Sequence, residues 1–360
     1  MSAKRTFALF IALAMALTLF AGCGGSTPAT SDAPASDAPA SDAPASDGAV
    51  DKSAITGNVV FYTADPEEIA TEVLEAFVAE YPNCTYTLNR NGTGKLTAAM
   101  TAELEAGGTE CNCFSFSDLA YIYNLEKEGL LLHFTPEGAE NLVDTTFGDM
   151  AYSYKLENCG IAYNKSLISD APKDWFDLAN PEYKDMVAFA DPSYSGAALT
   201  TAVVHDYNGD VTGWDFYKAM KDNGLKFEQS NGNLQQKVSS GEYAAVVIVD
   251  YMARNSISEG APIDFIYPES GGVIIYSPFA IMNTVKDEDK DAVLAFADFL
   301  LSDTAQAIFA KYNYLPGMKT ATAPGGLDFN TIKFLNLDIN YYLENVDQVR
   351  TTYEELFPAS

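Results

Sequence analysis

Residues 187–200 constrain the fold more than any other stretch, because they change from one structural type to another within a few positions. Residues 187–190 form a short apolar run that is typical of a buried strand, and Asp191-Pro192 interrupts it. Serines and a glycine then lead into a run of good helix formers. The pattern predicts a strand that turns directly into a helix.

Such a junction suits an anion, since the first N–H groups of a helix have no intrahelical partner and lie at the positive end of its dipole. Serine side chains add hydroxyl groups, and a glycine allows a ligand to approach the backbone. We therefore predict ligand-binding residues at Ser193, Ser195, Gly196 and Ala197. The alternative is that Ser193 or Ser195 only caps the helix.

Three earlier strand–helix units favour the same kind of site. Apolar strands are expected at 57–63, 85–88 and 111–115, each followed by a helix. Three such units in a row indicate an open, largely parallel α/β sheet, in which ligands bind at the carboxyl ends of the strands. The residues expected at that edge are Thr63, Gly92, Thr93, Gly94, Ser115 and Ser117.

Two aspartates follow predicted strands and have specific predicted roles. Asp65 precedes Pro66-Glu67 and is expected to cap the helix that begins there. Asp250-Tyr251 follows an apolar strand at 244–249, where an acid and an aromatic ring would point into a cleft. The alternative for this pair is an N-cap followed by a packed aromatic residue. We include Asp250 and Tyr251 among the predicted ligand-binding residues.

The N-terminus has the form of a secretory signal over residues 1–22. Lys4 and Arg5 precede an apolar run at 7–21 that is too short for a comfortable transmembrane helix. Cys23 directly follows Ala-Gly, which resembles the signal of bacterial lipoproteins, in which this cysteine is lipidated. The alternative is a plain secretory peptide. Residues 23–56 contain repeats of Ser-Asp-Ala-Pro-Ala and are expected to form a disordered tether.

Charge and histidine content exclude several classes of function. Without Lys4 and Arg5 the chain carries 19 basic and 50 acidic residues, a net charge of −31. This charge disfavours nucleic acid and anionic membranes as partners. The two histidines, His133 and His205, offer few ligands for a zinc site and few candidates for the base of a Ser-His-Asp triad. Since no nucleophile–base motif is present, we expect neither an enzyme nor a cofactor.

The cysteines beyond Cys23 leave two alternatives open. Outside the cytoplasm, four cysteines allow three disulfide pairings, whereas buried free thiols fit the sequence at least as well. Two of them lie two positions apart in an expected strand, so their Cα atoms would be roughly 6.6 Å apart, near the limit for a bridge. The four are Cys84, Cys111, Cys113 and Cys159.

Eight stretches occur in an order that is typical of one family. They are Val-Val-Phe-Tyr at 59–62, Asn-Gly-Thr-Gly-Lys-Leu at 91–96, Glu-Gly-Leu-Leu at 128–131, Gly-Ile-Ala-Tyr-Asn at 160–164, Asp-Pro-Ser-Tyr-Ser-Gly at 191–196, Ser-Gly-Glu-Tyr at 240–243, Ile-Tyr-Pro-Glu at 266–269, and a helix pair at 287–311 closed by Tyr-Leu-Pro at 314–316. In this order the chain resembles the extracellular solute-binding proteins of ABC importers. The resemblance is to the branch with ferric-iron-binding and phosphonate- or sugar-phosphate-binding proteins.

The resemblance implies a two-lobed, periplasmic-binding-protein-like α/β fold (type II), with the ligand in the cleft between the lobes. Lobe 1 is expected from residues 57–154 plus 281–360, and lobe 2 from residues 155–280. It also implies hinge closure on the ligand and docking of the closed form on a membrane permease. We expect a monomer at the cell surface, anchored through Cys23 to the outer face of the cytoplasmic membrane.

One departure from the family separates the ligand hypotheses. Iron-binding members carry two adjacent tyrosines at the position of Asp250-Tyr251, and here the first is an aspartate. The first hypothesis is therefore a small anion, an organic phosphate or a phosphonate such as 2-aminoethylphosphonate, with Asp250 facing the amine. The alternative is ferric iron or an iron complex, held by Tyr251, Asp250, Tyr62 and Tyr276. A tethered ligand-sensing receptor is a further alternative.

Overall fold

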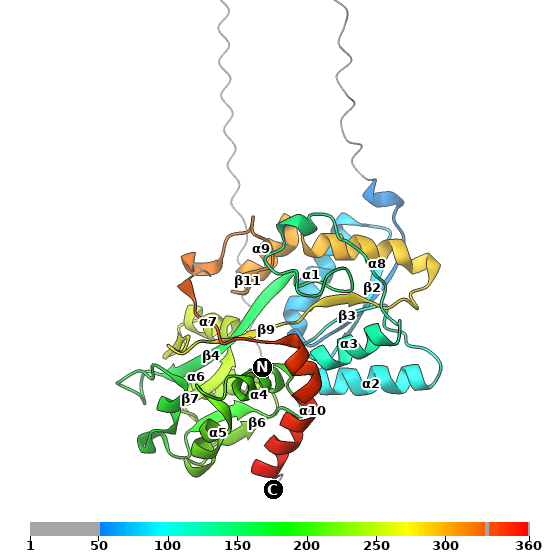
Figure 1. The fold of residues 1–360 in the computed structure, drawn as a ribbon. Helices are drawn as coiled ribbons and strands as arrows, with labels where there is room; N and C mark the ends of the chain where they lie inside the picture. The colour runs from blue at the N-terminus through cyan, green and yellow to red at the C-terminus, as the bar shows by residue number, and fades with distance from the viewer. Residues whose placement is uncertain (1–50, 328–330, 359–360) are drawn as a thin grey trace, which may run out of the picture. The chain divides into compact units, whose positions relative to one another are not determined.

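Two β-sheets organise the chain in the computed structural model, which describes residues 51–327 and 331–358 (Figure 1). The described residues belong to one compact unit. Cys23 and the expected tether up to residue 50 lie outside them. We call the part around the smaller sheet the first lobe and the part around the larger sheet the second lobe.

The smaller sheet has the strand order β10-β3-β1-β2. Its strands are β1 (Gly57–Thr63), β2 (Cys84–Arg90), β3 (Cys113–Ser115) and β10 (Phe279–Ile281). β1 runs parallel to β2 and β3, and β10 is antiparallel to β3. Thr63 lies opposite both Arg90 and Ser115, so the three parallel strands end at one edge, as predicted.

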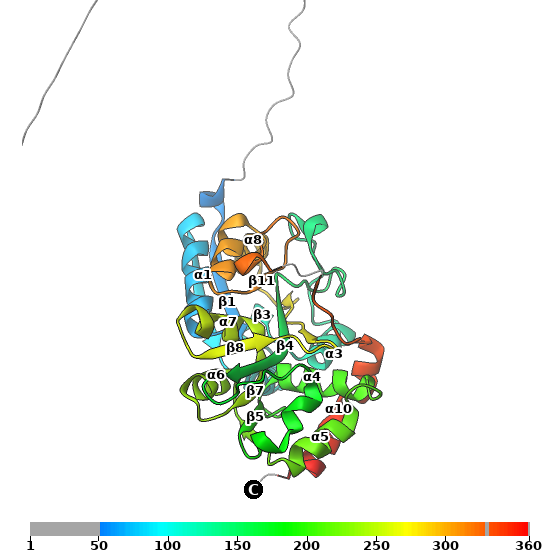
Figure 2. The same cartoon turned by 90° about the vertical axis from the view of Figure 1, so that its left-hand side faces the viewer.

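The larger sheet has the order β11-β4-β7-β5-β6, with β8 and β9 also paired to β4. Its strands are β4 (Lys155–Asn164), β5 (Val187–Ala190), β6 (Lys226–Glu228), β7 (Ala245–Val249), β8 (Ile263–Ile266), β9 (Val273–Ile275) and β11 (Leu315–Pro316). β5, β6 and β7 are parallel to one another, and β4 is antiparallel to β7. All ten residues of β4 are buried, and this strand runs through the centre of the view in Figure 2.

The helices of the first lobe pack on the smaller sheet and on each other. They are α1 (Glu67–Glu80), α2 (Thr93–Glu105), α3 (Leu119–Lys127), α8 (Asp287–Leu300) and α9 (Asp303–Lys311). In α1, apolar side chains at helical spacing, such as Ile69, Val73 and Phe77, form the buried face. α1 ends at Glu80, with Tyr81 as its C-cap just before Pro82, because proline has no N–H to continue the helix.

The helices of the second lobe are α4 (Gly196–Tyr207), α5 (Gly213–Asp222), α6 (Asn231–Ser240) and α7 (Asp250–Ser258). Short 3-10 helices occur at Lys52–Ala54, Ala139–Asn141, Trp175–Ala179, Pro181–Tyr183 and Pro324–Gly326. The predicted turn from strand to helix is confirmed, since five residues separate β5 from α4. Ser195 caps α4 by accepting a hydrogen bond from the Ala198 N–H at 3.3 Å.

The C-terminal helix α10 (Ile339–Leu356) lies mainly against the second lobe, whereas residues 281–360 were expected in the first (Figures 1 and 2). The reason is its aromatic face. The Tyr341 hydroxyl donates to Asp206 at 2.6 Å, and the Tyr353 ring lies edge-on to Tyr217 on α5. α10 also reaches α3, so it contacts both lobes.

Cys84, Cys111, Cys113 and Cys159 are all free and buried, which decides between the two alternatives in favour of buried thiols. Within the described residues, we find no single helix with the length and apolar character needed to cross a membrane. One bent pair, α8 with α9, passes this test by length and composition together.

Candidate functional site

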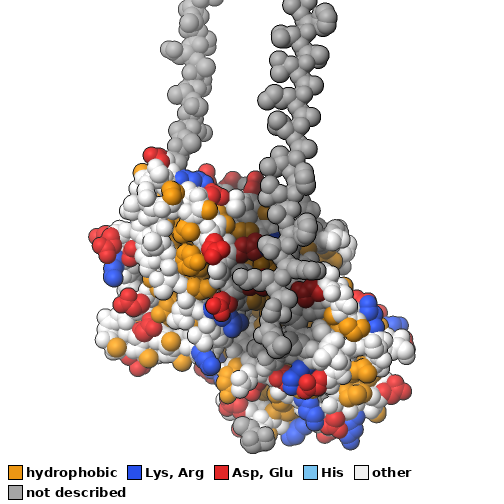
Figure 3. Space-filling view, turned by 180° about the vertical axis from the view of Figure 1, so that it is seen from behind, with side chains coloured by type: hydrophobic (Ala, Val, Ile, Leu, Met, Phe, Trp, Pro, Cys, Tyr) orange, Lys and Arg blue, Asp and Glu red, His pale blue; other side chains and the backbone are white. Residues whose placement is uncertain are grey.

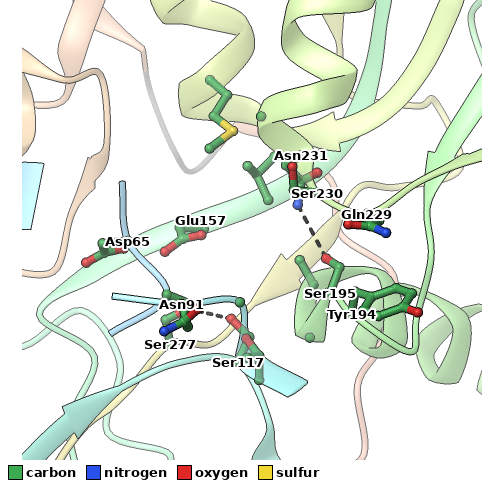
Figure 4. A pocket seen from close by; sticks show the side chains of 18 of the residues that line it. Asp65, Asn91, Ser117, Glu157, Tyr194, Ser195, Gln229, Ser230, Asn231 and Ser277 are labelled. Atoms are coloured by element: carbon green, nitrogen blue, oxygen red, sulfur yellow. Dashed lines mark hydrogen bonds between the residues drawn. The ribbon is translucent and has the colours of Figure 1, made fainter. Parts of the chain in front are cut away.

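A cavity of about 300 Å³ lies where both lobes contribute residues (Figure 4). The first lobe provides the ends of β1, β2 and β3 and the start of α2. The second lobe provides β4 and the starts of three helices. The lining residues are Ala64, Asp65, Arg90, Asn91, Gly92, Thr93, Lys95, Ser115, Ser117, Glu157, Tyr194, Ser195, Gly196, Ala197, Gln229, Ser230, Asn231, Gly232, Asn233, Val249, Tyr251, Met252 and Ser277.

Four helix N-termini meet at this cavity. α2 contributes Gly92 and Thr93, α4 contributes 195–197, α6 contributes 230–233, and α7 contributes Val249 and Tyr251. Each brings the positive end of a helix dipole and first-turn backbone N–H groups that lack intrahelical partners, although the N–H groups of Ala198, Asn233 and Tyr251 donate to the side chains of Ser195, Ser230 and Asp250. Arg90 and Lys95 add formal positive charge. The combination favours an anionic group.

The attraction for an anionic group comes from the residues that line the cavity. The protein as a whole is strongly acidic, with a net charge of −29. Acidic and basic side chains are interspersed over the face seen in Figure 3. A negative ligand therefore gains little from the overall field and depends on the donors that line the cavity.

Hydroxyl groups of the second lobe and the first lobe face the same space. Asn231 lies 3.5 Å from the Ser195 hydroxyl, and the hydroxyls of Ser117 and Ser277 lie 2.5 Å apart (Figure 4). The Ser115 hydroxyl donates to the Ser277 carbonyl oxygen at 2.8 Å. These bonds fix the orientation of the side chains around the cavity.

Most of the predicted ligand-binding residues come together here. Those that line the cavity are Gly92, Thr93, Ser115, Ser117, Ser195, Gly196, Ala197 and Tyr251. Thr63, Gly94, Ser193 and Asp250 do not. Thr63 is fully buried, and its hydroxyl accepts from the Asp65 N–H at 3.1 Å. Gly94 and Ser193 instead line a neighbouring groove.

Asp250 does not line the cavity, so it is not placed to make the expected contact with a ligand amine there. Its carboxylate is fully buried and lies 3.0 Å from the Arg254 guanidinium, one helical turn along α7. The hydroxyl of Tyr267 donates to it at 2.7 Å and the side chain of Asn158 at 3.1 Å. With these partners, Asp250 holds β4, α7 and the end of β8 together.

Sequence reasoning missed the acidic floor of the cavity, which consists of Asp65 and Glu157 (Figure 4). Asp65 does not cap α1, whose N-cap is Pro66 and receives no side-chain bond. Both carboxylates contact the buried ammonium of Lys155, that of Asp65 at 3.0 Å. The signal was present in β4, where Lys155 and Glu157 lie two apart in a fully buried strand and therefore share a face.

Burial governs the ionisation of this floor. Burial raises the pKa of Glu157, while the neighbouring Lys155 opposes the rise. Burial acts to lower the pKa of Lys155, but the carboxylates of Asp65 and Glu157 outweigh it and raise that pKa above its ordinary value. Lys155 therefore keeps its proton at neutral pH.

The four residues of the iron hypothesis do not gather around one point. Of Tyr251, Asp250, Tyr62 and Tyr276, the cavity is lined by Tyr251 alone. The Tyr62 hydroxyl donates to Glu103 at 3.1 Å, and the Tyr276 ring lies edge-on to Phe147. Tyr251 stacks on Tyr314, with ring centroids 3.8 Å apart.

Comparison with known proteins identifies the family. The sequence profile of the bacterial extracellular solute-binding proteins matches residues 116–342. The chain belongs to this family. The resemblance to the solute-binding proteins of ABC importers is thereby confirmed, and such proteins bind small ligands and deliver them to a permease.

Solved structures have the same two-lobed fold as this solute-binding protein. The periplasmic binding protein AfuA from Actinobacillus pleuropneumoniae, with exogenous fructose-6-phosphate bound, matches with a TM-score of 0.76 and 20% identity, over 84% of this chain and 99% of AfuA. Iron-bound HitA from Pseudomonas aeruginosa matches with a TM-score of 0.71 and 19% identity, over 84% and 99%. An uncharacterized protein of Haemophilus influenzae is 24% identical over 311 residues, 79% of this chain and 86% of that protein. The predicted α/β, two-lobed fold is confirmed.

Proposed function

We propose that this solute-binding protein captures a small organic phosphate or phosphonate in the cavity and delivers it to an ABC permease. The observation that carries the proposal is the convergence of four helix N-termini with Arg90 and Lys95. A phosphate or phosphonate group has several acceptor oxygens, and so it is able to accept hydrogen bonds from several helix N-termini at once. The AfuA structure supports the choice, since it has fructose-6-phosphate bound.

The other end of the ligand is proposed to carry a hydrogen-bond donor, an amine in the case of 2-aminoethylphosphonate. The residue that supports an amine on the ligand is Glu157, and not Asp250 as first predicted. One oxygen of Glu157 contacts Lys155. Within residues 51–327 and 331–358, its second oxygen has no hydrogen-bond partner, and the residue lines the cavity. An unpartnered carboxylate oxygen of a residue that is largely buried and lines the cavity favours a ligand N–H or O–H group.

The thermal unfolding midpoint of residues 49–360, measured against a panel of compounds, tests the proposal. The panel contains phosphate, organic phosphates, 2-aminoethylphosphonate, sulfate, sugars and ferric citrate. A ligand that binds the native state alone adds about 2.7 kcal/mol of stability at roughly one hundred times its dissociation constant. We expect shifts with the phosphorus compounds. A shift with ferric citrate alone, accompanied by colour, would favour the iron alternative. Iron-bound HitA, which has a similar fold, is the reason to include ferric citrate in the panel.

We further propose that the protein is held by lipid on Cys23 at the outer face of the cytoplasmic membrane and acts as a monomer. Replacement of Cys23 by serine is expected to release it into the medium, and continued retention in the membrane fraction would contradict the anchor. The sensing alternative differs in its partner. Uptake of labelled ligand that disappears when the partner permease is deleted would favour import over sensing.

A further inference from the structure

A buried lysine lies at the acidic floor of the cavity. Lys155 begins β4, and its side chain has no exposed surface. Its ammonium lies 3.0 Å from a carboxylate oxygen of Asp65 and contacts Glu157. It also lies 4.5 Å from the centre of the Tyr314 ring and 5.3 Å from that of Tyr154. A charge in such a place persists because it is paired on two sides.

Phenol hydroxyls extend this oxygen cluster at Asp65, beside the ammonium. The Tyr154 hydroxyl donates to one oxygen of Asp65 at 3.0 Å, and the Tyr314 hydroxyl lies 3.4 Å from the other. Tyr251 stacks on Tyr314 and lines the cavity. Carboxylates and phenolates are the oxygen ligands that a hard metal ion selects. Among the described residues no group of three or more His, Cys, Asp or Glu is placed to hold a metal, so phenols would have to contribute to any such site.

We propose that Lys155 is a specificity-determining residue that keeps metal ions out of the cleft, because its ammonium occupies the position among the carboxylates and phenols that a hard cation would take. The inference deepens the proposed function, on which it rests in taking this cavity as the ligand site. It explains how a chain with the fold of iron-bound relatives takes an organic anion.

Two physical effects oppose a metal while Lys155 is present. A second cation within a few Å of the ammonium would be repelled strongly in a site with little solvent. Lys155 also satisfies carboxylate oxygens that a metal would need. Independently of these effects, burial raises the pKa of the Tyr251 and Tyr314 hydroxyls well above its ordinary value, and nearby carboxylates add to the rise, which Lys155 partly opposes at Tyr251.

The charges of Asp65, Glu157 and Lys155 also determine which ligand group can bind beside them. Lys155 compensates one of the two carboxylates, which leaves one negative charge between Asp65 and Glu157 when both are ionised. A single ammonium or a hydroxyl group of an organic ligand suits this one remaining negative charge, whereas a trivalent metal ion does not. Lys155 thus separates organic ligands from metals without touching the anion-binding helix N-termini.

Ferric citrate titration of the protein from residue 24 onward tests the proposal, with sodium citrate alone as the control for anion binding. The readouts are a visible tyrosinate charge-transfer band and the unfolding midpoint. Wild type is expected to give no band. Lys155→Met is expected to develop the band and to bind ferric ion at least about a hundredfold more tightly than wild type, since a like charge a few Å away is removed.

Two further variants serve as matched controls. Lys155→Arg keeps the cation and is expected to stay colourless. Lys95→Met removes a lysine that lines the anion side of the same cavity, and it is also expected to stay colourless. If Lys155→Met does not fold, the double variant Lys155→Met/Glu157→Gln restores the charge balance and is expected to show a weaker band.

Ferric binding by the wild type overturns the proposal, whatever the variants do. A folded Lys155→Met, or a folded double variant, that binds no ferric ion overturns it as well. Titration of wild type with 2-aminoethylphosphonate runs in parallel. Failure of that titration counts against the proposed function, while the comparison between lysine and methionine at 155 still decides the present inference.

Discussion

Gly196 lies so close to Ser117 that a Cβ atom added to the glycine would be 2.0 Å from the Ser117 carbonyl oxygen. Gly196 begins α4 in the second lobe, and Ser117 follows β3 in the first. Gly94 and Ser193 form a second such pair, in which the added Cβ would be 2.8 Å from the Ser193 carbonyl oxygen. The two lobes therefore meet backbone to backbone beside the cavity, at positions where glycine is required.

Replacement of Gly196 by alanine is expected to prevent the lobes from reaching this arrangement. The methyl group would overlap the Ser117 carbonyl, and overpacking of this kind costs typically about 1–3 kcal/mol. Because a ligand held by both lobes depends on that arrangement, we expect its affinity to fall at least about tenfold. Calorimetric titration checks the affinity.

Gly232→Ala is the matched control, since Gly232 lines the same cavity and its added Cβ would meet nothing closer than 3.7 Å. This variant should bind normally, and α6 should gain slightly from the better helix former. Equal binding by the two variants would show that contact at Gly196 does not limit closure.

Ser195→Ala removes the cap of α4 and a hydroxyl that lines the cavity. The loss of an N-cap serine costs about 1 kcal/mol of stability, and the exposed N–H groups of α4 lose a neighbouring donor to the anion. We expect a lower unfolding midpoint together with weaker binding of organic phosphate. Ser193→Ala, outside the cavity, should change neither property, and a larger loss with Ser193→Ala would contradict the geometry.

Glu157→Gln separates the two ends of the ligand. If Glu157 faces an amine, this change should weaken 2-aminoethylphosphonate much more than methylphosphonate, which lacks the amine. Calorimetry with both compounds provides the comparison. Identical losses for the two compounds would rule out recognition of an amine by Glu157.

Asp250→Asn makes an informative companion to Glu157→Gln. Asp250 is buried against Arg254 and does not line the cavity, so its replacement should lower stability without changing the preference between the two compounds. Breaking a buried pair typically costs about 3–5 kcal/mol, because one charge remains buried without its partner. Chemical denaturation measures this loss. A changed ligand preference in Asp250→Asn would restore the earlier interpretation of that residue.

His205 is expected to make the protein sensitive to acid. It is fully buried beside Trp175, neither ring nitrogen has a hydrogen-bond partner among the described residues, and burial lowers its pKa to about 3. The unfolded chain binds a proton below about pH 6.5, whereas the folded protein does not. Stability is therefore complete above pH 6.5 and falls as the pH drops toward 3.

The loss attributable to His205 is about 2 kcal/mol at pH 5, at roughly 1.4 kcal/mol per pH unit. His205→Phe should remove this part of the acid-side loss, as measured by denaturant unfolding from pH 7 to pH 5. His133→Gln alters an exposed histidine and should leave the loss in place. An unchanged pH profile in His205→Phe would mean that His205 protonates in the folded state.

The anion side of the site was predictable because its determinants are local. A strand end, a glycine and a serine within a few residues define a helix N-terminus, and Ser195 and Gly196 carry that signal by themselves. The register of β1 with β3, which brings Thr63 opposite Ser115, followed from the repetition of strand–helix units. Gly94 and Ser193 had the right local signal but contact each other, which depends on how the two lobes meet.

The acidic side was not predictable from local sequence, because its partners are distant in the chain. Asp65 meets Lys155 across 90 positions, and nothing near Pro66 indicates that the aspartate turns inward instead of capping α1. The predicted contact between Asp250 and the ligand differs from the structure for another reason. The local signal at Asp250 was correct for a strand end, but Arg254 and the distant Tyr267 engage its carboxylate in the interior.

Calorimetric titration of the wild-type protein with 2-aminoethylphosphonate, methylphosphonate and ethylamine tests the central claim most directly. We expect both phosphorus compounds to bind, because the helix N-termini hold the phosphonate group, and ethylamine alone to give no measurable heat. Binding of ethylamine as strong as that of 2-aminoethylphosphonate, or no binding of either phosphonate, would contradict the assignment of this cavity to an organic anion.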